Sequence, residues 1–158
     1  MQKRNITVKN RSGKVIYNGN TLVPRTVFVI SPDPTTGKID PKSMFVFAVK
    51  GEEPLTQSTE FYSLPMYNIF ERNQICWGSY VNYDFGTADD LSKCASVHAR
   101  MYEATCNLDL TPRVNWNWIH ENIPGPHNNI ESFVHVFKYL EDKEEYPEEL
   151  LIPTRFGF

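Results

Sequence analysis

An α+β domain is predicted for this chain, because β-strand patterns fill its first half and helical patterns its second half. Four short stretches rich in β-branched and aromatic residues come first, and turn signals separate them. The stretches span residues 5–10, 14–19, 25–31 and 44–51. The turn signals are Ser12-Gly13, Asn18-Gly19 and the loop SPDPTTGKIDPK at residues 31–42. Short connections between successive strands favour an antiparallel meander.

Residues 51–79 lose the strand period, and Pro54 and Pro65 interrupt them. We expect this irregular segment to cross the sheet. Long segments without regular structure often carry functional residues, so candidate site residues are sought here first.

Two segments of the second half have apolar residues at helical spacing. In residues 89–106 the repeating positions are Leu91, Cys94, Ala95, His98, Met101, Tyr102 and Thr105. In residues 128–143, after an Asn cap, they are Ile130, Phe133, Val134, Phe137 and Leu140. Thr87 and Asp90 resemble a capping box for the first helix, and Pro147 ends or redirects the second. Residues 111–128 are predicted to be an irregular connection anchored by Trp116 and Trp118.

Length and composition fit one soluble domain over residues 1–158. No apolar run approaches the roughly 20 residues that a membrane helix requires, and no secretory signal follows the basic N-terminus. Three cysteines without close pairing favour reduced thiols in a reducing compartment. A cytoplasmic location is therefore expected.

Charge is distributed unevenly, although the net charge is only −3. Residues 1–50 hold nine Lys or Arg against two Asp, whereas residues 141–149 are mostly acidic. Both are usually solvated surface. If the N-terminal cations share one face, that face could attract an acidic protein partner. These cations are Lys3, Arg4, Lys9, Arg11 and Lys14. The acidic total argues against nucleic acid as a partner.

A metal or cofactor site is not expected. Cys94 and His98 lie four residues apart, and Cys106 and His120 would complete a set of four. Structural zinc sites normally use closely paired cysteines, so core packing is favoured for this helix face. His127 and His135 are interpreted as surface or loop residues. The chain also lacks a Gly-rich phosphate loop, a G-x-S-x-G elbow and an H-E-x-x-H motif.

Cys76, between Ile75 and Trp77, allows two interpretations. A cysteine beside large apolar residues is more often a buried hydrophobe than a nucleophile. However, the segment "NIFERNQIC", which runs from Asn68 to Cys76, resembles the active-site segment of ubiquitin-conjugating enzymes. In that family a His-Pro-Asn motif leads through an Ile and a short turn to an Ile-Cys pair. The spacing from Asn to Cys is the same here, while Met66 and Tyr67 stand in place of His and Pro.

The chain is more similar to a bacterial branch, the prokaryotic family D of ubiquitin-conjugating-like proteins and protein B of the PRTRC system. In that branch a Pro and an aromatic residue precede the Asn, and a Cys-x-Gly follows, as in Pro65, Tyr67 and Gly78 here. The resemblance covers roughly residues 44–153. It implies the ubiquitin-conjugating (UBC-like) fold, without the N-terminal helix that often contacts the activating enzyme.

The resemblance also implies a cysteine thioester transferase. Cys76 would carry a ubiquitin-like protein as a thioester and yield it to an amine. Asn68 would stabilise the tetrahedral oxyanion, and Gly78 would let the modifier tail approach the backbone. Tyr67 and Trp77 would contact the modifier, although core packing is an equally good interpretation of Trp77. Candidate acids for activating the amine are Asp84, Asp89 and Asp109.

The implied partners are a ubiquitin-like modifier, an adenylating activating enzyme and a JAB-type deconjugating peptidase. The alternative is an inactive UBC-like scaffold in a plasmid, mobile-element or DNA-maintenance complex. The intact spacing from Asn68 to Cys76 favours the enzyme, whereas the missing His-Pro pair favours the scaffold.

Overall fold

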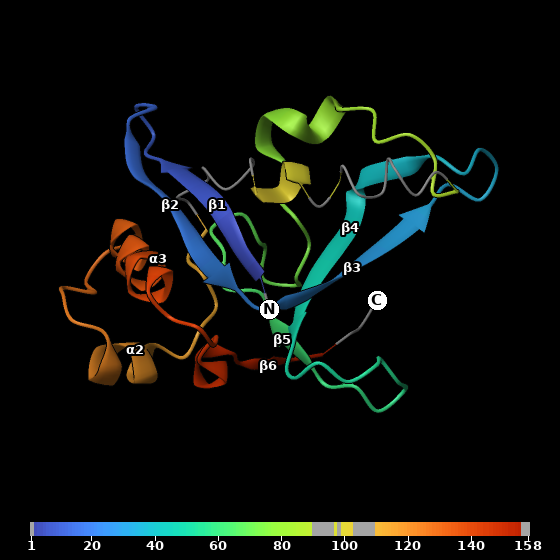
Figure 1. The fold of residues 1–158 in the computed structure, drawn as a ribbon. Coiled ribbons are helices and arrows are strands. Elements are labelled where there is room, and N and C mark those ends of the chain that lie inside the picture. Colours follow the sequence, from blue (N-terminus) through green and yellow to red (C-terminus); the bar gives the residue numbers. More distant parts are fainter. Residues whose placement is uncertain (1, 90–96, 98, 103–109, 156–158) are drawn as a thin grey trace.

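The computed structural model describes residues 2–89, 97, 99–102 and 110–155. Its architecture is mixed α/β with antiparallel strands and few helices, as the sequence predicts in outline. A two-stranded sheet and a four-stranded sheet lie at an angle to each other, and the helices of the second half lie beside the smaller sheet (Figure 1).

The first sheet is a hairpin of β1 (Gln2–Lys9) and β2 (Val15–Val23). The Asn10 side chain closes its turn by accepting hydrogen bonds from the Ser12 and Lys14 backbone N–H groups at 3.1 and 3.0 Å. Gly13 supplies the left-handed backbone at φ +82°. The turn predicted at Ser12-Gly13 is therefore confirmed.

The turn predicted at Asn18-Gly19 is wrong, because β2 runs straight through both residues. Gly19 is instead explained by a close approach of other side chains to its backbone. A Cβ atom there would lie 2.6 Å from the Tyr17 hydroxyl oxygen and nearer still to Glu141 Oε1. The Tyr17 hydroxyl donates to that same oxygen at 2.7 Å, so the missing side chain leaves room for this hydrogen bond.

Gly19→Ala is therefore expected to destabilise the protein by about 1 kcal/mol, the usual worth of one hydrogen bond. Without the close contact, alanine would instead stabilise a strand slightly by reducing backbone entropy in the unfolded chain. Denaturant unfolding measures the sign. In a Glu141→Ala background the cost should shrink; an equal cost in both backgrounds would contradict this explanation.

The second sheet has the order β3-β4-β5-β6, with every pair antiparallel. Its strands are β3 (Arg25–Pro32), β4 (Ile39–Val49), β5 (Phe61–Ser63) and β6 (Pro153–Thr154). The predicted single meander is thus divided: β2 and β3 belong to different sheets, and Pro24 lies between them. Proline has no N–H to offer a neighbouring strand, and its fixed φ favours such a change of direction.

The predicted C-terminal helix is confirmed as a 3₁₀ turn, η2 (Ile130–Phe133), followed by α3 (Val134–Glu141). The Asn129 side chain caps η2 by accepting from Ser132 N at 3.0 Å. α3 packs on β2 (Figure 1). In the buried seam between them, Thr21 Oγ1 donates to the Phe137 carbonyl at 2.8 Å. Of the five apolar positions predicted for this helix, Phe133, Val134, Phe137 and Leu140 are buried, and Ile130 is half-buried against the core.

The connection predicted over residues 111–128 contains an unexpected helix, α2 (Trp116–Asn122). Asn115 begins it, because its side chain accepts from Trp118 N at 3.2 Å. Two further 3₁₀ turns are η1 (Gly78–Asn82) and η3 (Glu148–Leu150). Of the helix predicted over residues 89–106, Asp89 lies in a turn and Val97 and residues 99–102 are helical, while the remainder, residues 90–96, 98 and 103–106, lies outside the described residues. That remainder includes Asp90 of the predicted capping box.

The predicted basic face does not include Arg4. Side chains alternate along β1, so Arg4 lies on the same side as the buried Ile6 and Val8. Its guanidinium carbon is 5.8 Å from the Tyr102 ring centroid. Lys3, on the opposite side, is exposed and donates to the Glu141 carbonyl at 2.8 Å.

No helix among residues 2–89, 97, 99–102 and 110–155 is long and apolar enough to span a bilayer.

Candidate active site

A tight hairpin within the irregular segment positions Cys76. Ile69 and Ile75 form an antiparallel bridge, flanked by hydrogen bonds from Phe70 N to Gln74 O at 2.8 Å and from Cys76 N to Asn68 O at 2.7 Å. The backbone therefore pairs Asn68 directly with Cys76 across the neck of this hairpin, which we call the Cys76 hairpin (residues 68–76).

Asn73 makes the turn of the Cys76 hairpin. Its φ is +65°, a left-handed conformation that asparagine tolerates better than most residues, and its N–H donates to Phe70 O at 2.9 Å. The side chain is 2% exposed, and its Nδ2 donates to Thr154 Oγ1 of β6 at 2.9 Å. The turn is thus tied to a strand far along the sequence.

The hairpin also extends the second sheet along β4. Gln74 bridges Phe45, Val46 N donates to Asn73 O at 2.9 Å, and Ile75 N donates to Met44 O at 3.0 Å. These bonds fix the returning strand against β4, just beyond the short pairing of β4 with β5. A rigid sheet therefore supports the backbone of the residue that precedes Cys76.

Cys76 itself is half-buried. Its two neighbours in sequence are more deeply buried than Cys76: Ile75 is 2% exposed and Trp77 is 3% exposed. The chain buries both large flanking side chains and leaves the thiol-bearing residue partly accessible. This arrangement favours a presented thiol over a buried apolar cysteine.

Asn68 is completely buried. Its Nδ2 donates to the Met101 carbonyl at 3.0 Å, which ties the Cys76 hairpin to the helical residues 99–102. Its Oδ1 has no hydrogen-bond partner among the described residues. The amide thus holds two segments together. To act as an oxyanion donor it would have to use its second N–H or break the bond to Met101.

Met66 and Tyr67, which replace the family's His and Pro, are both core residues at 2% and 0% exposure. The Tyr67 ring packs edge-on against Phe133, with centroids 5.6 Å apart, and its hydroxyl donates to Ile130 O at 2.7 Å. Burial raises the pKa of Tyr67 above its usual value. Its side chain therefore anchors η2 and is not available to a modifier in this structure.

Trp77 also belongs to the core, as the second interpretation of this residue expected. Its ring lies 4.7 Å from that of Phe85, between centroids. Its indole Nε1 is buried without a hydrogen-bond partner among the described residues. Gly78 is exposed at φ +53°, and a Cβ there would meet no atom within 4 Å. Of the three candidate modifier contacts, only Gly78 is open to solvent.

Among the candidate acids and metal ligands, the structure describes Asp84, Asp89 and His120. Asp84 and Asp89 are exposed, and Asp84 accepts from Gly86 N at 2.8 Å. Asp109, Cys94, His98 and Cys106 lie outside the described residues. The sequence did not indicate that His120, His127 and His135 form a row, with ring centroids 5.4 and 6.1 Å apart. In the described part of the chain, no group of three or more His, Cys, Asp or Glu could hold a metal ion.

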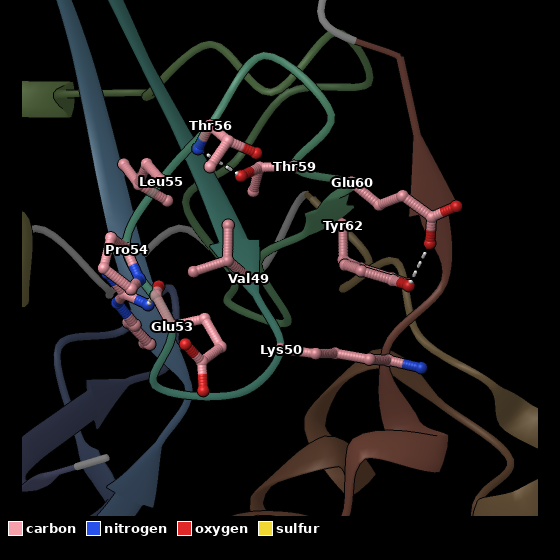
Figure 2. A pocket seen from close by; sticks show the side chains of 10 residues that line it. Val49, Lys50, Glu53, Pro54, Leu55, Thr56, Thr59, Glu60 and Tyr62 are labelled. Carbon is pink, nitrogen blue, oxygen red and sulfur yellow. Dashed lines mark hydrogen bonds between the residues drawn. The ribbon is translucent and has the colours of Figure 1, made fainter.

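A cavity of about 300 Å³ lies at the end of β4, away from the Cys76 hairpin in sequence (Figure 2). Its lining comes from β3, the end of β4, the following loop and the start of β5: Arg25, Val49, Lys50, Glu53, Pro54, Leu55, Thr56, Thr59, Glu60 and Tyr62. The Lys50 ammonium lies 4.5 Å from the Tyr62 ring centroid, and Tyr62 donates to Glu60 at 2.9 Å. None of the predicted site residues lines this cavity.

Comparison with known proteins identifies the family. No curated protein and no solved structure matches the chain. A model of prokaryotic E2 family D matches residues 1–103, which include both sheets up to β5 and the whole Cys76 hairpin. The match begins earlier than the sequence resemblance predicts, and it ends before α2 and α3. The chain therefore belongs to prokaryotic E2 family D.

Proposed function

We propose that this protein is a ubiquitin-conjugating enzyme of the UBC-like fold, which carries a ubiquitin-like modifier as a thioester on Cys76. Family membership indicates a role related to ubiquitin-like conjugation. The observation that carries the specific proposal is the half-buried Cys76 at the neck of a braced hairpin, between two buried neighbours.

The reaction proposed for Cys76 is an exchange of thioesters followed by transfer to an amine. The Cys76 thiol loses its proton to solvent, and its Sγ attacks the acyl carbon of the modifier held by the activating enzyme. A new C–S bond forms, and the activating enzyme's thiolate leaves with the electron pair. An amine then attacks the same carbon, loses a proton to solvent as the amide forms, and releases Cys76 as a thiolate. Sulfur suits both steps, because a thiolate attacks well and also leaves well.

Asn68 supports this reaction by holding Cys76 in place. Its carbonyl accepts from Cys76 N at 2.7 Å, and its amide is fixed on the Met101 carbonyl at 3.0 Å. Asn68 therefore joins the backbone of Cys76 to the helical residues 99–102. Gly78, exposed directly after Trp77, leaves space for the modifier's backbone near the sulfur.

The partners that follow are a ubiquitin-like modifier and an adenylating activating enzyme. A JAB-type peptidase would reverse the conjugation. The scaffold alternative predicts that the protein binds these partners without accepting an acyl group, so a covalent intermediate separates the two functions.

We expect the wild-type protein to form a covalent adduct when it is mixed with its activating enzyme, ATP and modifier. The adduct should migrate as a one-to-one complex on a non-reducing gel, and excess thiol reductant should release it, because thioesters exchange with free thiols. Omitting ATP is the control. If the protein binds the modifier but forms no adduct that reductant releases, the scaffold function is supported and the enzyme function is contradicted.

A further inference from the structure

The two faces of the Cys76 hairpin differ in their surroundings. The bridge between Ile69 and Ile75 puts these side chains on one face, where both are buried at 6% and 2% exposure. Cross-strand partners point to the same side and side chains alternate along a strand. Asn68, Phe70, Gln74 and Cys76 therefore share the opposite face, with Gln74 across from Phe70.

That opposite face is closed at one end and open at the other. At the Asn68 end, the Met101 carbonyl accepts from the Asn68 amide, and both residues are completely buried. At the turn end, Phe70 is 40% exposed, one of few large apolar side chains this exposed in the described part of the chain. Within the Cys76 hairpin, the direction from Cys76 along this face that leads to an exposed apolar side chain is the one toward Phe70.

We propose that Phe70 is a specificity contact for the modifier, and that it receives an apolar side chain at the second or third residue from the modifier's C-terminus. This inference rests on the proposed thioester on Cys76. An acyl group on Sγ is tethered within one bond of the sulfur, so its first residues lie over this face. Phe70 is two residues from Asn68, or about 7 Å along the strand, which an extended tail spans in two residues.

The chemistry of the contact is apolar packing. A half-exposed aromatic ring gains when it covers an aliphatic side chain, because both lose contact with water. A tail with leucine opposite Phe70 would therefore react faster than one with alanine. About fivefold is expected for a partly buried contact of this size.

The test uses two tetrapeptide thioesters with a mercaptoethanesulfonate leaving group, Ala-Leu-Leu-Gly and Ala-Ala-Ala-Gly. Cys76 Sγ bonds to the acyl carbon as mercaptoethanesulfonate leaves as a thiolate, and the cysteine proton passes to solvent. Intact mass measures the adduct, and the reaction of Cys76→Ala is subtracted as the contribution of the other cysteines. The ratio of the two rates cancels the intrinsic reactivity of the thiol.

Wild type should prefer the leucine peptide about fivefold, and Phe70→Ala should bring the ratio close to one. Phe70→Leu should retain most of the preference. Leu55→Ala is the matched control, since Leu55 is 47% exposed but lies in the loop beside the cavity of Figure 2. It should react as wild type does.

Two other results have distinct meanings. Equal rates with both peptides, or an unchanged preference in Phe70→Ala, would overturn the role of Phe70 while the adduct on Cys76 keeps the proposed function. If the peptides label wild type and Cys76→Ala equally, Cys76 does not accept thioesters, and the proposed function and this inference both fail.

Discussion

Replacing Cys76 with alanine is expected to abolish formation of the reductant-sensitive adduct with the modifier. The expectation follows from chemistry, because alanine has no nucleophile and no other group could form an exchangeable thioester at this place on the hairpin. The fold should survive, since Cys76 is half-buried and its hydrogen bond to Asn68 O at 2.7 Å comes from the backbone. A single-turnover assay on non-reducing gels measures the loss.

Cys76→Ser should separate the nucleophile from the surrounding structure. Serine preserves the size of the side chain, but its acyl adduct is an oxyester, which resists thiol reductants. A slowly formed adduct that survives reductant is therefore expected. Cys94→Ala and Cys106→Ala are matched controls, because these are the chain's other cysteines and the sequence favours packing roles for them. Charging of Cys76→Ala at the wild-type rate, or loss of charging in either control while it remains folded, would assign the acceptor elsewhere.

The strands of the first half could be predicted from sequence because their signals are local. Alternating apolar residues locate β1 to β4, and Gly13 at positive φ confirms the turn at Ser12-Gly13. Asn18-Gly19 gives the same local signal, yet it lies inside β2. The glycine serves a different contact, because Glu141, which is distant in sequence, occupies the space that a Cβ at position 19 would fill. No local pattern reports such a contact.

Division of the strands into two sheets was also beyond local patterns. Pro24 marks the place, but a single proline between two strands is compatible with a hairpin as well as with a change of sheet. α2 was missed because Trp116 and Trp118 suggested anchors of a loop. The cap at Asn115, read together with the following residues, is the signal that would have found this seven-residue helix.

The candidate site could be predicted in part. Spacing identified Asn68 and Cys76 as a pair, and the hairpin brings their backbones together at 2.7 Å. The same sequence motif could not predict which of its side chains are exposed to solvent. Tyr67 and Trp77, at 0% and 3% exposure, pack into the core against elements far along the chain, and Phe70, which no motif singled out, is exposed at 40%.

Asn68→Ala is expected to lower the free energy of unfolding by about 2 kcal/mol, roughly twice the cost of Gly19→Ala. The substitution removes the hydrogen bond from Nδ2 to the Met101 carbonyl and leaves that buried acceptor without its donor. Denaturant unfolding measures this loss. Asn5→Ala is the matched control, because Asn5 is exposed on β1 and its side-chain bond to Asn18 is long at 3.3 Å; it should change stability little.

The Asn68→Ala variant also distinguishes two roles of Asn68 in the reaction, positioning of Cys76 and hydrogen bonding to the oxyanion. A side chain fixed on Met101 acts through the position of Cys76, so charging and discharge should slow by similar factors, and alkylation of Cys76 by iodoacetamide should change in parallel. A donor to the oxyanion would behave differently, because its loss costs about 100-fold or more in the step that it stabilises. Discharge to an amine slowed by that factor, with charging and alkylation near wild type, would overturn the positioning role. Because the amide is fully buried and already bonded to the Met101 carbonyl, we expect the parallel loss.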